Sequence, residues 1–295
     1  MLFAKPALAV TSMDMEAVGN SAGMIAIGHI VGFDESANSI FENPAAFSRN
    51  KAPSITTFYT TTMAQETQFY TVGFSLPFGP GNFGIGQFQS RIPNNPVTGA
   101  TDSDEFYQAD SFDYKLSILK LAYGLPLSAK SSVGIVYNLT TLDEYTTHAQ
   151  AHSLDLGYQT QLDALTLSLT GKNIVPLSPL TFESGKTETL PIRLIGGFKW
   201  QVTSEWSVFG QLSQTANSPF LKAGGIQFTP TFLAKMLVLS AGMQERHVQS
   251  SIKQRGALGV GLFVSPIIFH FAYEKSDYVV DDNHYYVSFA FNFAP

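Results

Sequence analysis

Residues 285–293 read YYVSFAFNF, and this stretch decides the class of fold. Every odd position carries an aromatic or aliphatic side chain, whereas Ser288, Ala290 and Asn292 are among the residues between them. Successive side chains of a β-strand point to opposite faces, so the stretch has one large apolar face and one mostly small or polar face. Such a strand suits a wall with lipid on one side and a packed interior on the other.

The same alternation recurs along most of the chain. Residues 70–78 and 190–200 each have one aromatic-aliphatic face and one face richer in small or polar residues. Dividing the chain at its turn signals predicts about fourteen strands. They are expected near 52–62, 68–78, 82–92, 111–126, 131–142, 148–159, 164–172, 189–202, 206–214, 219–228, 233–245, 252–263, 267–277 and 283–293.

The connections between these strands also alternate in character. Short turns such as Gly79-Pro80-Gly81 and Ser265-Pro266 follow the even strands, and the two longest connections, near 93–110 and 173–188, follow odd ones. Short turns at one end and long loops at the other are typical of outer-membrane barrels with an even strand number. The sequence therefore predicts an all-β, 14-stranded antiparallel transmembrane β-barrel in a bacterial outer membrane. Lipids would surround it, and both termini would be periplasmic.

A large soluble β-sandwich is the alternative, because its strands alternate as well. A sandwich face turned to water should carry Lys, Glu and Arg, but here the second face carries Gly, Ala, Ser and Thr. The apolar faces also begin or end in aromatic residues such as Tyr70, Trp200 and Tyr285, as the interfacial girdle of a barrel requires. Both features favour the barrel.

The composition excludes several other classes of protein. Charged residues make up 14% of the 295 residues, against about 25% in an average soluble protein. Proline and glycine interrupt the apolar stretches, so no membrane helix of about 20 residues is predicted. A net charge of −6 argues against a nucleic-acid partner, and the lack of cysteine excludes disulfides and thiolate metal sites.

The first 51 residues do not alternate and divide into two parts. Residues 1–9 end in Ala7-x-Ala9, a small-residue pattern that suggests the remnant of an export signal, the alternative being a frayed terminus. Residues 10–51 are too few to form a core of their own. Their Gly and Ala spacing suits packing inside the barrel formed by 52–295, so we expect a plug in the lumen. Its motif residues are Gly23, Gly28, Asp34, Glu35, Asn43, Pro44 and Ala45.

This segment resembles a known family. A Gly/Ala-rich stretch, the acidic pair Asp34-Glu35 and then residues 38–45, NSIFENPA, are similar to the N-terminal signature of FadL-type outer-membrane proteins. Residues 167–174, 190–197 and 255–261 resemble later strands of the shorter PorV/PorQ-like branch. The resemblance implies a plugged barrel of fourteen strands, the same number that the turn signals predict.

The resemblance leaves two functions open, neither of them enzymatic and neither using a cofactor. A PorV/PorQ-like barrel would anchor or hand over secreted proteins at the cell surface, in a role like that of type IX secretion. A FadL-like barrel would take up long-chain fatty acids or other hydrophobic small molecules. The connection near 93–110 is polar and acidic rather than apolar, which favours the docking role. Uptake is the alternative.

Inward-facing charges are the remaining candidates for a site. They could pair with one another or with the plug, for instance with Asp34 or Glu35. They could instead orient the head group of an amphipathic ligand, such as a carboxylate on Arg193 or Lys199. Strand parity predicts that the following face the lumen: Asp155, Arg193, Lys199, Arg255, His270 and Glu274.

Some apparent motifs predict no chemistry. Residues 79–84 match a dinucleotide-binding glycine pattern and residues 19–23 match a serine-nucleophile pattern, but the first runs into a strand and no apolar strand precedes the second. His148 and His152 are four residues apart, as are His270 and Glu274, which on a strand is roughly 13 Å. We therefore predict no catalytic residue and no metal site.

Overall fold

The computed structural model describes residues 18–62, 67–100, 106–145, 147–216, 218–248, 251–275 and 284–293. They form a closed antiparallel barrel of 14 strands, and a two-residue strand, β8 (Thr187–Glu188), adds to one edge of β7. The predicted fold class and strand number are confirmed. The predicted export-signal remnant, 1–9, lies outside the described residues.

Except in β3, β4 and β7, the strand bounds lie within four residues of those predicted from the sequence. The barrel strands are β1 (Ser54–Thr62), β2 (Thr67–Phe78), β3 (Gly81–Ala100), β4 (Phe106–Pro126), β5 (Ser131–Glu144), β6 (Thr147–Leu162), β7 (Leu165–Phe182), β9 (Arg193–Gln201), β10 (Trp206–Thr215), β11 (Leu221–Phe228), β12 (Leu237–Val248), β13 (Ser251–Val264), β14 (Ile267–Lys275) and β15 (His284–Asn292). A 3-10 turn, η3 (Thr231–Leu233), lies between β11 and β12.

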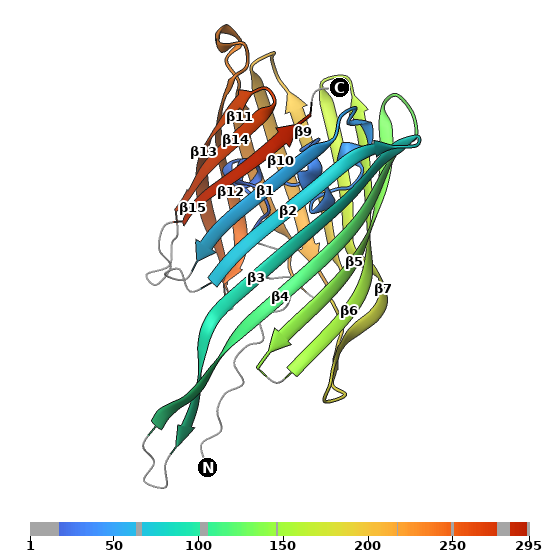
Figure 1. Ribbon diagram of the computed structural model, residues 1–295. Helices are drawn as coiled ribbons and strands as arrows, with labels where there is room; N and C mark the ends of the chain where they lie inside the picture. The colour runs from blue at the N-terminus through green and yellow to red at the C-terminus, as the bar shows by residue number, and fades with distance from the viewer. Residues whose placement is uncertain are drawn as a thin grey trace.

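The first and last strands close the wall. Strand β1 pairs with β15, from Ser54 opposite Asn292 to Tyr59 opposite Val287. Every other barrel strand pairs with its neighbours along the chain, and β7 pairs with β9 past the short β8 (Figure 1). Closure removes the unpaired strand edges that an open sheet would expose.

Exposure along β15 alternates as the sequence does. Tyr285 is 62% exposed and Phe289 50%, whereas Tyr286 and Ser288 are each 2% exposed. The large apolar side chains therefore point out of the barrel and the intervening ones point in. None of the helices in the described part of the chain is long and apolar enough to cross a membrane.

The two connections predicted as long loops are largely strand. Strand β3 continues to Ala100 and β4 begins at Phe106, which gives a hairpin that projects beyond the rest of the barrel (Figure 1). Strand β7 likewise continues to Phe182, with shifts of register against β6. In the β3–β4 hairpin the alternation fades because a two-stranded ribbon outside the barrel meets water on both faces, so its side chains need not alternate. In the β7 extension the register shifts against β6 interrupt the alternation, although Leu180 is still buried in the core there.

The N-terminal segment, residues 18–53, lies inside the ring of strands (Figure 1). It contains a short helix, α2 (Ala22–Ala26), and two 3-10 turns, η1 (Ala37–Ile40) and η2 (Ala46–Arg49). Its apolar side chains meet inward-facing ones from the wall. The core thus lies between this segment and the barrel, in clusters that include Ile40, Phe41 and Phe47 with Phe69, Phe88 and Leu116, and Met24 and Ile25 with Phe58 and Tyr286.

Candidate functional site: the N-terminal segment and two lumen cavities

Helix α2 is only one turn and a half long, so packing and capping must hold it. The hydroxyl oxygen of Ser21 accepts a hydrogen bond from the Met24 N–H at 3.1 Å, which caps the helix. The Ala22 N–H donates to the hydroxyl of Ser288 on β15, also at 3.1 Å. The first turn is thereby fixed to the wall.

The residues after α2 lie directly on glycines of the barrel. A Cβ atom at Gly225 of β11 would come within 2.2 Å of the Ile27 carbonyl oxygen, and one at Gly242 of β12 within 2.1 Å of the Gly28 nitrogen. Gly28 itself has φ +87°, a conformation that residues with side chains rarely adopt. Backbone therefore packs on backbone here, and glycine is required on both sides.

Glu274 of β14 joins this part of the segment to three other strands. Its Oε1 lies 2.9 Å from His29 Nε2 and accepts from Gln244 Nε2 at 3.1 Å. Its Oε2 accepts from the Tyr286 hydroxyl at 2.9 Å and from Arg255 Nη1 at 3.5 Å. The carboxylate is 1% exposed, so these partners replace the water that it would otherwise bind.

Asn43 docks the other half of the segment against β6 and β7. Its Nδ2 donates to the Ser168 hydroxyl at 2.8 Å and to the Tyr158 carbonyl at 3.1 Å, while its Oδ1 accepts from the Ala45 N–H at 3.0 Å. A Cβ at Gly157 of β6 would lie 2.0 Å from that Oδ1. The Asn-Pro-Ala motif thus fits into a gap that a wall glycine leaves.

The predicted acidic pair has mainly local partners. The Asp34 carboxylate accepts hydrogen bonds from the Ser36 N–H at 2.7 Å and from Asn38 Nδ2 at 3.0 Å. A contact between the segment and a charged side chain of the wall is made by His29, whose Nε2 lies 2.9 Å from Glu274 Oε1. Parity could place the inward charges of the wall, but not their partners, which depend on the path of the segment through the lumen.

Asp155 belongs to a separate polar cluster that includes a lysine the sequence analysis missed. Lys120 of β4 is 2% exposed, and its Nζ donates to Asn138 Oδ1 at 2.9 Å and lies 3.6 Å from Asp155 Oδ2. The Asn173 N–H also donates to Asp155, at 2.7 Å, where β7 adopts a positive φ. Lys120 shares the inward face of β4 with Leu116 and Ile118, so this face lacks the small-residue pattern from which strand parity could have identified the lysine.

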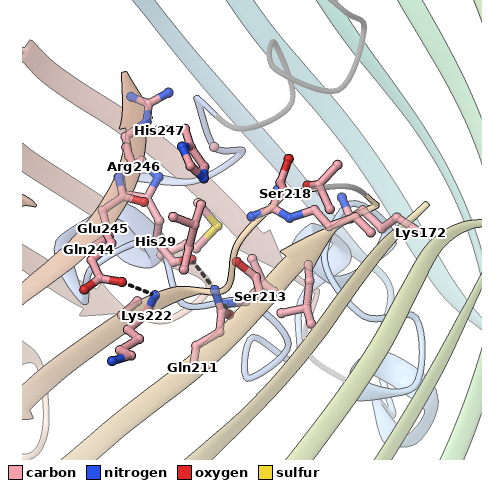
Figure 2. A pocket seen from close by; sticks show the side chains of 18 of the residues that line it. His29, Lys172, Gln211, Ser213, Ser218, Lys222, Gln244, Glu245, Arg246 and His247 are labelled. Atoms are coloured by element: carbon pink, nitrogen blue, oxygen red, sulfur yellow. Dashed lines mark hydrogen bonds between the residues drawn. The ribbon is translucent and has the colours of Figure 1, made fainter. Parts of the chain in front are cut away.

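A cavity of about 280 Å³ lies on one side of the N-terminal segment. Polar and basic side chains gather on it from the N-terminal segment and the wall, as Figure 2 shows. We call it the arginine cavity, after Arg193 and Arg246. Its other polar lining includes His29, Lys172 and Gln211, and its apolar lining is Met24, Val31, Phe41, Phe88, Ile195 and Leu221.

A second cavity, of about 410 Å³, lies on the other side of the segment. We call it the lysine cavity, after Lys199, whose Nζ is 5.8 Å from the centroid of the Phe209 ring. His270 lines it as well, and the imidazole packs on α2 at Gly23. Its remaining lining includes Asp34, Glu35, Glu42, Phe33, Ile30 and Phe263.

The two cavities lie toward opposite ends of the barrel. Arg193 begins β9 and Leu221 begins β11, at the end that carries the β3–β4 hairpin. Lys199 lies near the end of β9 and Phe263 near the end of β13, beside the short turns. The N-terminal segment therefore separates an arginine cavity toward the long connections from a lysine cavity toward the short ones.

Glu42 is a buried carboxyl group that the sequence analysis did not single out. Its Oε2 accepts from the Gly32 N–H at 2.8 Å, and its Oε1 has no hydrogen-bond partner among the described residues. Burial, together with the nearby charge of Asp34, raises its pKa to about 8. At neutral pH this group is mostly protonated.

The histidines of β6 have separate partners. His148 Nδ1 lies 2.6 Å from Asp143 Oδ1, and His152 Nδ1 lies 2.6 Å from the Tyr137 hydroxyl. Within the described residues, no group of three His, Cys, Asp or Glu side chains is placed to hold a metal ion.

Comparison with known proteins gives matches among solved structures. No family model and no curated protein matches the chain. The toluene transporter TbuX of Ralstonia pickettii is 12% identical with a TM-score of 0.62, over 95% of this chain and 100% of that one. The CymD monoaromatic hydrocarbon channel is 12% identical with a TM-score of 0.64, over 95% and 99%. A FadL homologue of Pseudomonas aeruginosa is 12% identical with a TM-score of 0.59, over 93% and 98%.

The chain has the fold of these barrels. At such low identity the likeness extends to the fold alone, which is that of an outer-membrane β-barrel of FadL type. The resemblance to FadL-type proteins is thus confirmed at the level of the fold, whereas the PorV/PorQ-like branch stays a prediction. Two of the three neighbours are named for transport and none for catalysis.

Proposed function

We propose that this barrel is an outer-membrane uptake channel that binds hydrophobic small molecules in its lumen. The observation that carries the proposal is the arginine cavity, which combines an apolar floor with several basic side chains. Small-molecule sites in proteins have this character, with mostly apolar walls and a few polar groups that fix orientation. The names of TbuX and CymD, a toluene transporter and a monoaromatic hydrocarbon channel, support hydrophobic cargo.

The lining favours an amphipathic molecule with an acidic head. Arg193 at the start of β9 presents a guanidinium, which binds a carboxylate through two parallel hydrogen bonds. Met24, Phe88 and Ile195 offer apolar contacts for a chain or ring. Of the two residues that the sequence suggested for a head group, Arg193 lies in the arginine cavity and Lys199 in the lysine cavity.

Docking of secreted proteins, the function that the sequence favoured, has less support. The neighbours reported above include two transport proteins and no secretion protein. The projecting β3–β4 hairpin is the feature that keeps docking as a second candidate, because its outer part extends beyond the paired wall (Figure 1). Capture of a stoichiometric surface protein that is lost when residues 93–110 are shortened would establish it.

Equilibrium binding of labelled decanoate, decanol and toluene to the purified barrel tests the uptake proposal. Decanoate should bind, and Arg193→Gln should weaken its binding by roughly ten- to a hundredfold, since a hydrogen bond to a charged group contributes roughly 1.5–3 kcal/mol. Decanol, which has the same chain without the charge, should respond little to the substitution. Arg91→Gln is the matched control, because Arg91 pairs with Asp113 outside the lumen.

Three outcomes are informative. If Arg193→Gln leaves the affinity for decanoate unchanged, Arg193 does not bind the head group. Binding of decanol and toluene but not of decanoate would keep the channel and exclude the acidic head. No saturable binding of any of the three would contradict the proposed function.

A further inference from the structure

One residue in the described part of the chain lines both cavities. Among the described residues, Met24 of α2 lines both the arginine cavity and the lysine cavity. It is 7% exposed, and its terminal methyl lies 2.7 Å from the position that a Cβ of Gly19 would take. Gly19, with φ +105°, thus leaves the space in which the end of this side chain lies.

The backbone that carries Met24 is interlocked with the wall on three sides. Gly225 and Gly242 meet the backbone of Ile27 and Gly28 at distances that leave no room for a Cβ, and a Cβ at Gly259 of β13 would lie 2.3 Å from that of Ala26. Hydrogen bonds from Ala22 to Ser288 and from His29 to Glu274 hold both ends of the same stretch. Displacing α2 would break all of these contacts together.

The Met24 side chain, by contrast, packs only through apolar contacts and can change rotamer without breaking a hydrogen bond. Methionine has three rotatable side-chain bonds and no polar group that must keep a partner, so it adapts to irregular space. It also contacts an open volume on each side, about 280 Å³ and about 410 Å³. Rotation of this side chain requires no break in the backbone contacts of α2.

We propose that Met24 is the gate between the two cavities, and that a ligand passes when this side chain rotates while α2 stays in place. The inference rests on the proposed function only for what the ligand is. The position of the gate follows from the structure. It makes the lysine cavity a second binding site on the same route, with Phe33 and Phe209 for apolar groups and Lys199 for an acidic one.

Planar-bilayer conductance and uptake of labelled decanoate by cells measure the gate separately. Met24→Ala should raise the single-channel conductance and decanoate uptake severalfold. Met236→Ala is the matched control, because Met236 is 47% exposed in the connection before β12 and should change neither. Met24→Cys offers a second variant: the native chain has no cysteine, so a bulky thiol reagent would attach at this position and should close the opened channel again.

A cross-link distinguishes a side-chain gate from movement of the whole helix. The Ala22 nitrogen and the Ser288 hydroxyl are 3.1 Å apart, so Ala22→Cys with Ser288→Cys should bridge α2 to β15 once oxidised, as a shift in mass verifies. In this background Met24→Ala should raise conductance equally under oxidising and reducing conditions. An effect seen only after reduction would overturn the gate, because α2 would then have to move.

The remaining outcomes are also decisive. Suppose that folded Met24→Ala has the conductance of the wild type and that the reagent does not lower the conductance of Met24→Cys. These results would overturn the gate but would not contradict the proposed function. Raised conductance without decanoate or toluene uptake would support the gate and overturn the proposed function.

Discussion

At the scale of single residues, Glu274 contributes most to the docking of the N-terminal segment. It receives four polar partners and is nearly inaccessible to water. A buried pair of this kind is a weak source of net stability, but removal of one charge leaves the other uncompensated. Its importance therefore lies in specifying where the segment sits.

Glu274→Gln should lower the free energy of unfolding of the barrel in detergent by about 3 kcal/mol, because Arg255 would lose its counter-charge and His29 its carboxylate partner. Denaturant titration, followed by gel mobility without boiling, measures the change. Glu183→Gln, in an exposed turn, is the control and should stay within about 0.5 kcal/mol of the wild type. Equal stability of the two variants would show that the ion pair does not hold the segment.

Glu42 should make stability depend on pH. Its pKa rises from 4.5 to about 8 in the folded chain, so the folded state keeps a proton that the unfolded state releases between these values. The free energy of unfolding should therefore fall as pH increases from about 4.5 to about 8. Glu42→Gln, which is neutral at every pH, should remove this part of the decline.

The difference in free energy of unfolding between Glu42→Gln and the wild type reports on Glu42, because both proteins contain all the other titratable groups. Below the lower pKa the two should be similar in stability, and above the upper pKa the variant should be the more stable. A difference that does not vary with pH would contradict the burial of Glu42 as a neutral acid.

At the scale of elements, glycines of the wall determine how the N-terminal segment docks. Gly157→Ala should dislodge the Asn-Pro-Ala motif, because the new Cβ would come within 2.0 Å of Asn43 Oδ1. Gly256→Ala is a matched change on β13, where a Cβ would meet no described atom within 4 Å. Limited proteolysis of residues 18–53 should accelerate in the first variant and not in the second.

The β3–β4 hairpin and the short turns should lie on opposite sides of the membrane. We propose that the hairpin is outside the cell and that the short turns are periplasmic. A membrane-impermeant thiol reagent should then label Thr98→Cys on intact cells and leave Ser204→Cys unlabelled until the outer membrane is opened. The native chain has no cysteine, so each label reports one position. The reverse pattern would invert the topology.

Alternation in the sequence predicted the strands correctly where one face meets lipid and the other meets the lumen. It did not predict the parts of strands that lack this arrangement. Strand β15 was placed within a residue at each end because its outward face is entirely large and apolar. The extension of β3 was predicted as a loop because a ribbon in water needs no alternation, and that of β7 because register shifts against β6 interrupt its alternation. Proline at 93, 96, 176 and 179 reinforced that error, although unpaired strand edges accept proline.

At the scale of the whole molecule, the exterior matches a bilayer better than it matches water. Exposed aromatic residues lie near the short turns, where Trp206 and Phe228 have ring centroids 4.7 Å apart and Phe78 is 64% exposed. Such residues form the girdle of a barrel at the membrane interface. The low share of charged residues follows from this geometry.

The site was predictable only in part. Parity could indicate Arg193 and Glu274 as inward-facing residues, because each lies on a strand with clear alternation. It could not indicate the His29–Glu274 contact or the role of Met24, because both depend on how an irregular segment crosses the lumen. Buried residues of that segment carry no periodic signal.

Photo-crosslinking with a diazirine-bearing decanoate tests most directly the central claim, that a hydrophobic ligand enters the lumen beside the N-terminal segment. The account predicts saturable labelling of peptides that contain Met24, Phe88 or Ile195, with competition by unlabelled decanoate. Labelling confined to outward-facing residues such as Tyr285 and Phe289, without saturation, would show that the molecule only meets the barrel from the lipid and would contradict the account.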